Sequence, residues 1–76
     1  MAAKLTERVA VNIAGLRRAA GLSQEALARK ARISVSYVSM LERGQRSPPL
    51  ERLEALAAVL KVEPAYMLQR LDWPKD

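Results

Sequence analysis

The break between two short helical patterns restricts the fold of this chain more than any other feature of its sequence. One pattern ends near Ala31 and the next begins after Ser34, so only about three residues, Arg32 included, join the two helices. A connection this short forces the helices to cross steeply, with a small residue, Ala28, at their contact. The sequence therefore predicts a helix-turn-helix pair at about residues 23–43, whose second helix stands out from the body.

Residues that usually begin and end helices divide the first half of the chain. Ser23 and Ser34 are N-caps, while Gly21 and Gly44 supply stops. The first helix should turn inward an apolar stripe made of Leu5, Val9, Ile13, Leu16 and Ala20. The next two should bury Leu27, Ala28, Ala31, Val38 and Leu41, with Ile33 packing back onto the core.

The second half of the chain predicts two more helices after the loop GQRSPP. Pro48 or Pro49 opens a fourth helix, and Glu63 and Pro64 are suited to the cap and first position of a fifth, expected to reach Leu71. The inward face of the fourth helix should carry Leu50, Leu53, Leu56, Ala57 and Leu60. Five short helices with tight connections predict one compact all-α domain spanning residues 1–76.

Composition excludes several classes of function. The 76 residues include neither cysteine nor histidine, so disulfides, thiolate or imidazole metal sites and the usual general base are excluded. No pair of carboxylates shares an apolar face, so we expect no enzyme, no metal site, no cofactor and no small-molecule ligand. No apolar run approaches the ~20 residues that span a bilayer. Glu7 and Arg8 interrupt any signal-peptide pattern, so we expect a cytoplasmic protein without a membrane partner.

The charge of the chain and the outward face of the third helix favour nucleic acid as the partner. The formal net charge is +5 and the isoelectric point is about 10.3, above the value of ~9 that is typical of nucleic-acid-binding domains. Hydroxyl and apolar groups on a helix in the major groove can contact base edges and thymine methyls. We expect base contacts from Val35, Ser36, Tyr37 and Met40. The alternative is that the serines are plain surface residues and that Tyr37 lies against the body.

Residues around this face are candidates for phosphate contacts. Gln24 opens the second helix, where free backbone N–H groups and the positive end of the helix dipole favour a phosphate. Arg43 and Arg46 bracket the loop that follows the third helix. The expected phosphate contacts are Gln24, Ser39, Arg43, Arg46 and, with less support because it lies in the turn, Arg32.

Across nearly its whole length, the chain resembles a known family. The stretches LSQEALA, LERG and PPLERLEALAAVL, with inward Ile33, Val38 and Leu41, are similar to those of the Cro/phage-repressor (XRE) type of helix-turn-helix regulator. The resemblance implies a lambda-repressor-like fold and a bacterial or phage transcription regulator that binds operators as a homodimer. It also implies a pairing of Arg17 with Glu42.

The position of Glu42 on the inner side of its helix agrees with that pairing. A carboxylate there is costly unless it is matched, so we expect Arg17 and Glu42 to form a structural ion pair rather than to contact DNA.

The sequence departs from the family pattern at two points. Arg32 occupies the turn position usually held by Gly, where positive φ costs another residue roughly 1–2 kcal/mol. The outward positions of the third helix also lack the Gln, Asn or Arg that make bidentate base contacts. Specificity is then expected to depend on methyl contacts, on Arg46 and on DNA shape.

The C-terminal helix and tail, residues 64–76, are the expected dimerisation surface. They are more apolar than a last helix requires, and the candidate residues are Tyr66, Met67, Leu71 and Trp73. The alternative is that Leu68 and Leu71 close the core and that Trp73 covers a gap.

Two functions follow from these observations. The first is a sequence-specific, double-stranded DNA-binding transcription regulator that acts as a dimer on a palindromic operator through the major groove, without a cofactor. The second is a protein-interaction module on the same fold that lacks specific DNA readout. Phage repressors, restriction–modification controllers and antitoxins are not distinguished by the sequence.

Overall fold

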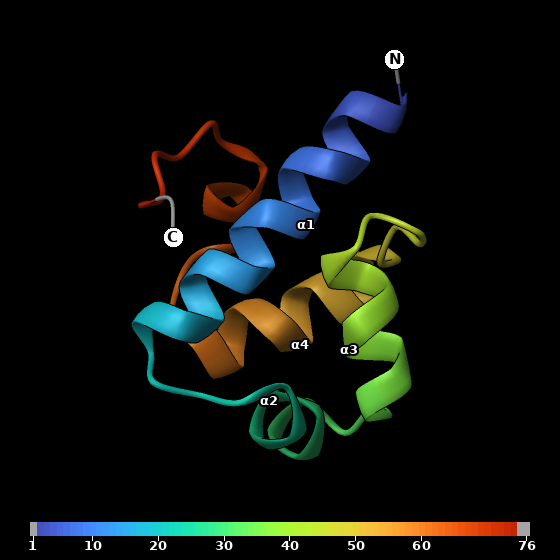
Figure 1. The fold of residues 1–76 in the computed structure, drawn as a ribbon, viewed down its shortest axis with the longest axis vertical. Coiled ribbons are helices and arrows are strands. Elements are labelled where there is room, and N and C mark those ends of the chain that lie inside the picture. The colour runs from blue at the N-terminus through green and yellow to red at the C-terminus, as the bar shows by residue number, and fades with distance from the viewer. Residues whose placement is uncertain (1, 75–76) are drawn as a thin grey trace.

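The computed structural model describes residues 2–74, with side chains from Lys4 onward. These residues form four α-helices and one short 3₁₀ helix: α1 (Ala2–Ala19), α2 (Gln24–Ala31), α3 (Val35–Glu42), α4 (Leu50–Leu60) and η1 (Pro64–Leu68). In Figure 1, α1 crosses the front of the molecule, α3 stands at one side, and the C-terminal segment (residues 64–74) lies on the opposite side of α1. The predicted all-α class and the helix-turn-helix pair are confirmed.

Serine N-caps begin α2 and α3 as the sequence predicts. The Ser23 hydroxyl accepts a hydrogen bond of 3.0 Å from the Ala26 N–H, and the Ser34 hydroxyl accepts one of 3.0 Å from the Tyr37 N–H. Each cap satisfies a backbone donor that the first turn of a helix leaves without a partner. The start of α3, the second helix of the pair, is thus fixed locally.

All four α-helices end in the same hydrogen-bonded motif, in which a residue in the left-handed conformation reverses the chain. Gly21 and Gly44 hold that position after α1 and α3, with φ of 72° and 73°. Arg32 and Lys61 hold it after α2 and α4, with φ of 61° and 62°. The predicted positive φ at Arg32 is therefore present, and Lys61 is a second strained position that the sequence pattern did not indicate.

Replacing Lys61 by glycine should stabilise the fold by up to about 1 kcal/mol. Left-handed φ costs a side-chain-bearing residue roughly 1–2 kcal/mol, and the flexibility of glycine in the unfolded chain offsets part of that gain. Lys61→Ala, which removes the charge and keeps Cβ, is the matched control. Thermal unfolding of the two variants should place Lys61→Gly above Lys61→Ala, and equal midpoints would show that this position is not strained.

One core joins all the helices. Its fully buried large apolar side chains come from α1, α2, α3, α4 and η1, and they are Ile13, Leu27, Val38, Leu41, Leu56 and Met67. Ala28 is buried at 4 % exposure, as expected of the small residue where α2 and α3 cross.

Three residues expected on inward faces are exposed instead. Leu5 is 45 % exposed, Ala20 lies on the surface, and Leu50 is 78 % exposed although helical spacing places it in line with Leu53. Leu5 and Leu50 belong to the first turns of their helices and border an open hollow of about 300 Å³ beside Leu68. Helical spacing predicts the direction of a side chain, but not whether another element reaches far enough to cover it.

The prediction of a fifth α-helix from Pro64 to Leu71 is wrong. Glu63 precedes Pro64 as predicted, but the helix is of 3₁₀ type and stops at Leu68, and the backbone is extended at Gln69. The cause lies in α1, where the Asn12 amide donates hydrogen bonds of 2.8 Å to the Met67 carbonyl and 2.7 Å to the Gln69 carbonyl. In an α-helix the Met67 carbonyl would accept a hydrogen bond from a backbone N–H of the next turn. Here it accepts one from the Asn12 side chain instead.

Candidate nucleic-acid interface

Helix α3 carries the residues expected to contact bases and is called the recognition helix below. One of its faces packs on the core and the other is exposed. Val38 and Leu41 are buried in the core, while Val35 is 42 % exposed and Ser36 is exposed. Met40 is half-buried. Among the residues expected to contact bases, Val35 and Ser36 are therefore the most accessible.

Tyr37 lies against the body beside two arginines. Its side chain is half-buried, and the guanidinium carbon of Arg52 lies 5.2 Å from the centre of its ring. The guanidinium carbon of Arg46 lies 5.8 Å from the same ring centre. Cations at these distances from an aromatic face are attracted by its quadrupole. The position of Tyr37 therefore favours the alternative, in which this residue packs on the body, over the expectation that it contacts bases.

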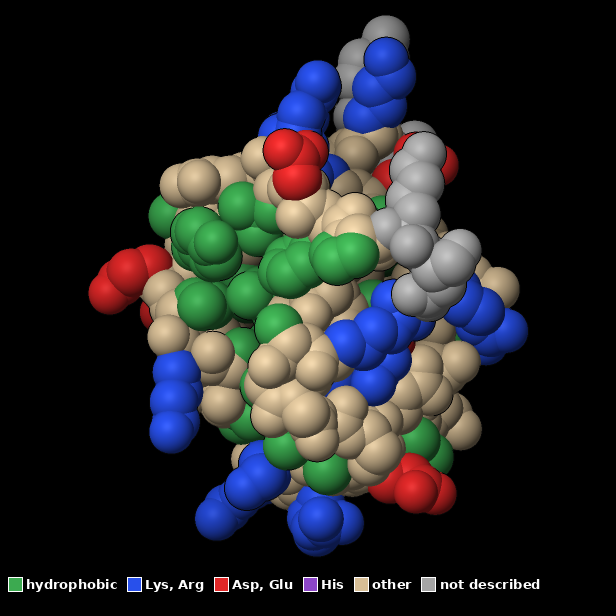
Figure 2. All heavy atoms as spheres, turned by 60° about the vertical axis from the view of Figure 1, so that its left-hand side comes forward, with side chains coloured by type: hydrophobic (Ala, Val, Ile, Leu, Met, Phe, Trp, Pro, Cys, Tyr) green, Lys and Arg blue, Asp and Glu red, His purple; other side chains and the backbone are tan. Residues whose placement is uncertain are grey.

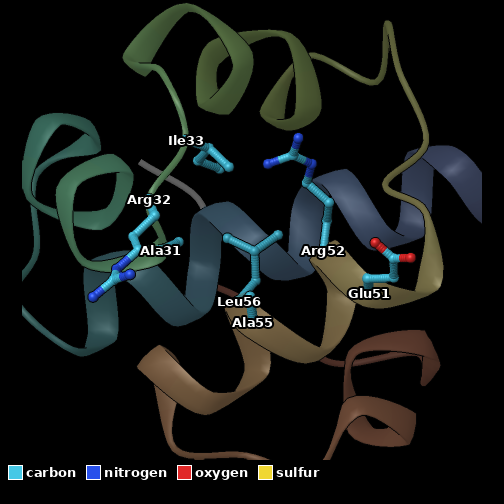
Figure 3. Close-up of a pocket in the computed structure, with 7 residues that line it drawn as sticks. All are labelled: Ala31, Arg32, Ile33, Glu51, Arg52, Ala55 and Leu56. Carbon is cyan, nitrogen blue, oxygen red and sulfur yellow. The ribbon is translucent and has the colours of Figure 1, made fainter.

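A basic hollow opens between α3, the α2–α3 turn and the start of α4. Its volume is about 600 Å³, and its lining includes Arg32, Tyr37, Met40, Arg46 and Arg52. A smaller hollow of about 340 Å³ adjoins it and is floored by Ile33, Ala55 and Leu56. Figure 3 shows Arg52 extending from α4 toward α3, with Arg32 on the far side of Ile33. Arg52 was not among the candidate DNA contacts expected from the sequence. The only signal for it there is its place in the first helical turn after the basic loop.

The other expected phosphate contacts surround α3 in different settings. Arg43 and Arg46 are exposed, and the Arg43 Nε donates a weak hydrogen bond of 3.4 Å to the Ser39 carbonyl. Arg32 is exposed in the turn, and Ser39 is half-buried. Basic residues therefore precede α3 at Arg32 and follow it at Arg43 and Arg46.

Arg17 and Glu42, expected to pair, are in direct contact between α1 and α3. The Arg17 Nε donates to one carboxylate oxygen at 2.6 Å, and its Nη2 donates to the other at 3.1 Å. The two side chains are only 11 % and 6 % exposed. The remaining Arg17 donor, Nη1, bonds the Leu22 carbonyl at 2.9 Å, so the guanidinium also fixes the α1–α2 turn.

Gln24 belongs to the same polar network. Its amide donates a hydrogen bond of 3.0 Å to the Glu42 carboxylate. This bond orients the Gln24 side chain at the N-terminus of α2. The ion pair therefore joins α1 to α3, and its carboxylate also orients a candidate DNA contact.

The C-terminal segment is fixed by Asn12, a buried polar residue of α1 that the sequence pattern did not single out. Asn12 is 1 % exposed, and besides its two bonds to backbone carbonyls it accepts a hydrogen bond of 2.9 Å from the Trp73 indole N–H. The Trp73 ring lies directly on Gly15, where an added Cβ would stand 2.3 Å from it. Only glycine at position 15 leaves room for the indole.

Two of the four residues expected at a dimer interface make their contacts within the same chain. Met67 is fully buried in the core and is not available to a partner, so its assignment to an interface is corrected. Trp73 covers α1, in agreement with the alternative interpretation, and Leu71 is half-buried. Tyr66 remains 39 % exposed. Figure 2 views the side where this segment lies and shows hydrophobic side chains gathered on its upper half, with arginine and lysine side chains around them.

Residues 2–74 contain no group of three or more acidic, cysteine or histidine side chains able to hold a metal ion. Within the same range, no helix combines the length and the apolar character needed to cross a bilayer.

A helix-turn-helix pair on a five-element helical body, with an exposed second helix between basic groups, defines the class of DNA-binding transcription regulators. The sequence profile of the helix-turn-helix family HTH_3 matches residues 13–67, and the chain belongs to this family. The family is one of transcriptional regulators.

Known relatives share both sequence and fold with the chain. The HTH-type transcriptional regulator y4dJ of Sinorhizobium fredii, described as uncharacterized, is 39 % identical over 64 residues, which are 84 % of this chain and 83 % of that protein. DdrOP3 of Deinococcus deserti, an HTH-type transcriptional regulator, is 37 % identical over 73 residues, which are 96 % of this chain and 54 % of that protein. The restriction-modification controller protein C.AhdI of Aeromonas hydrophila superposes with a TM-score of 0.79 at 39 % identity, covering 82 % of this chain and 94 % of that structure.

Proposed function

We propose that the protein regulates transcription as a homodimer that places α3 of each subunit in the major groove of a palindromic operator. The observation that carries the proposal is the exposed N-terminal end of α3, where Val35 and Ser36 face solvent while Val38 and Leu41 anchor the helix. In this arrangement Val35, Ser36 and Met40 contact base edges, and Gln24, Ser39, Arg43, Arg46 and Arg32 contact phosphates.

The size of the domain supports the proposal of a dimer. One module of this kind covers only about 600–1,000 Å² of its own surface on DNA, which is too little for tight specific binding. Two copies related by a two-fold axis read half-sites one helical turn, about 34 Å, apart. The likeness to a restriction-modification controller at 39 % identity supports a regulatory role for this domain.

The proposed dimer surface is the exposed side of the C-terminal segment. Tyr66 borders a mostly apolar hollow of about 610 Å³ lined also by Leu16, Val62 and Ala65. Leu68 is 37 % exposed on the same 3₁₀ helix. Met67 packs in the core and Trp73 packs on α1. Of the residues expected at the interface, Tyr66 and Leu71 therefore remain.

Selection of bound fragments from random DNA at ~150 mM salt tests the function. Enrichment of a palindrome supports the proposal, and the spacing of its half-sites locates the two-fold axis. If a folded protein enriches no sequence, the specific DNA readout is wrong, and a protein-docking role for the exposed face of α3 becomes the better interpretation.

Replacing Tyr66 by aspartate should shift the protein toward monomer in sedimentation experiments and weaken its binding to the selected operator. The substitution places a charge in an apolar surface that would otherwise be desolvated against the partner. Because Tyr66 is exposed in the protomer, the thermal stability of the monomer should change little. Val11→Asp, at an apolar residue of α1 that is 54 % exposed, is the matched control. A Tyr66→Asp variant that sediments like the parent protein would place the interface elsewhere.

A further inference from the structure

We infer that Arg52 is a further DNA contact and that, together with Arg46, it binds the phosphate backbone of one strand. The inference rests on the proposed function, because it adds one residue to the same DNA-binding surface. Arg52 belongs to the first turn of α4 (Leu50–Leu60), one helix beyond the recognition helix.

Tyr37 brings the two arginines together. The guanidinium carbons of Arg52 and Arg46 lie 5.2 and 5.8 Å from its ring centre, so they are no further apart than the sum of those distances. Successive phosphates of one strand rise by about 3.4 Å along the duplex axis. Two guanidiniums held beside one ring can therefore reach phosphates that are close neighbours on one strand.

The hydrogen-bond donors of both arginines are unused. Neither guanidinium donates a hydrogen bond or forms an ion pair with any group of residues 2–74, and both side chains are exposed. A cation held over an aromatic face keeps its in-plane N–H groups available, and a guanidinium has five of them. Their fork geometry matches the oxygens of a phosphate.

The charge around the hollow is uncompensated. Arg32, Arg46 and Arg52 all line it, and none of its lining residues is acidic. Glu51 borders the neighbouring hollow, and Figure 3 shows its carboxylate apart from the Arg52 guanidinium. Like charges collected around a hollow without a counter-charge destabilise the free protein and attract an anion. Duplex DNA seated on the adjacent α3 supplies phosphates at that place.

This geometry makes Tyr37 a positioning residue rather than a reader of bases. Its ring orients two guanidiniums, and its hydroxyl is not needed for that task. Tyr37→Phe should therefore retain the phosphate contact, whereas Tyr37→Leu should weaken it.

The first test measures binding to the selected duplex over a series of salt concentrations. Arg52→Ala should bind at least about tenfold more weakly than the parent protein at fixed salt. The fall of log K with log salt should become shallower by about 0.9 for each phosphate that a subunit no longer neutralises. Arg18→Ala is the matched control, because Arg18 is an exposed arginine of α1 beside Trp73 that belongs neither to the surface around α3 nor to the proposed dimer surface. Circular dichroism melting establishes that each variant is folded.

A second test identifies the phosphate. Single neutral methylphosphonates are placed in turn along the duplex, and binding of the parent protein is compared with that of Arg52→Ala. At the contacted phosphate, the neutral linkage should weaken the parent protein and should weaken Arg52→Ala much less, because the interaction is already absent.

Two results would overturn the inference. If the parent protein binds with a steep salt dependence and Arg52→Ala shows the same affinity and slope, the assignment of Arg52 is wrong while the proposed function stands. If the parent protein binds no duplex above background, both are wrong.

Discussion

Replacement of Glu42 by alanine should lower the free energy of unfolding by about 3–5 kcal/mol, because it leaves an uncompensated charge between two packed helices. Arg17 is only 11 % exposed and directs two of its donors at the Glu42 carboxylate. Gln24 would also lose the acceptor that orients its amide. Urea unfolding followed by circular dichroism measures the loss.

The matched control removes both charges at once. A double variant, Arg17→Met with Glu42→Leu, fills similar volumes with apolar groups, and such replacements of a buried ion pair are often neutral or stabilising. It should recover at least half of the stability that Glu42→Ala loses. A single variant that unfolds at the parent midpoint would show that the pair contributes little, whatever its geometry.

Recovered stability need not recover DNA binding. The double variant still lacks the acceptor that holds Gln24 at the N-terminus of α2. We therefore expect it to be folded yet weaker in DNA binding than the parent protein, which separates the two roles of Glu42.

Replacement of Asn12 by alanine should cost about 2–4 kcal/mol, since it leaves several polar groups of the C-terminal segment without partners. Asn12 makes three hydrogen bonds there, to the Met67 carbonyl, the Gln69 carbonyl and the Trp73 indole. Trp73 is the single tryptophan of the sequence, so its fluorescence reports directly on the segment. The emission of Asn12→Ala should shift to the red in the folded state as the indole becomes hydrated.

Two further variants divide this effect. Trp73→Phe keeps an aromatic ring over Gly15 and removes one hydrogen bond, so it should cost only about 1 kcal/mol. Gly15→Ala keeps Asn12 but places a Cβ 2.3 Å from the Trp73 ring, so the indole has to move. Gly15→Ala should therefore reproduce the fluorescence shift of Asn12→Ala. An unchanged spectrum in both variants would contradict the docking of the tail on α1.

Features fixed by short stretches of chain were predictable from the sequence. The serine caps of α2 and α3, the glycine stops and the short α2–α3 turn each depend on residues within four or five positions of one another. The Arg17–Glu42 pair was also accessible, because an inward carboxylate on an amphipathic helix requires a partner and the family resemblance named it.

Apart from that ion pair, features that join distant parts of the chain were not predictable. Asn12 is a polar interruption of an apolar stripe in the sequence, and only the arrival of residues more than fifty positions later turns it into a buried anchor. That same contact ends the expected fifth helix at Leu68. It also draws Trp73 onto α1, while Met67 is buried in the core.

The pairing of Arg52 with Tyr37 was hidden for the same reason. Helical spacing predicts the direction of each side chain on its own helix. Contact between α3 and the first turn of α4 depends instead on how the two helices pack in the fold. The sequence alone determined the four α-helices, the residues that cap and end α2 and α3, and the presence of a helix-turn-helix pair, because these follow from local hydrogen bonding and periodicity. Only the tertiary structure decided which side chains the C-terminal segment covers and which arginines stand together beside the recognition helix, because those contacts form between elements that no local pattern relates.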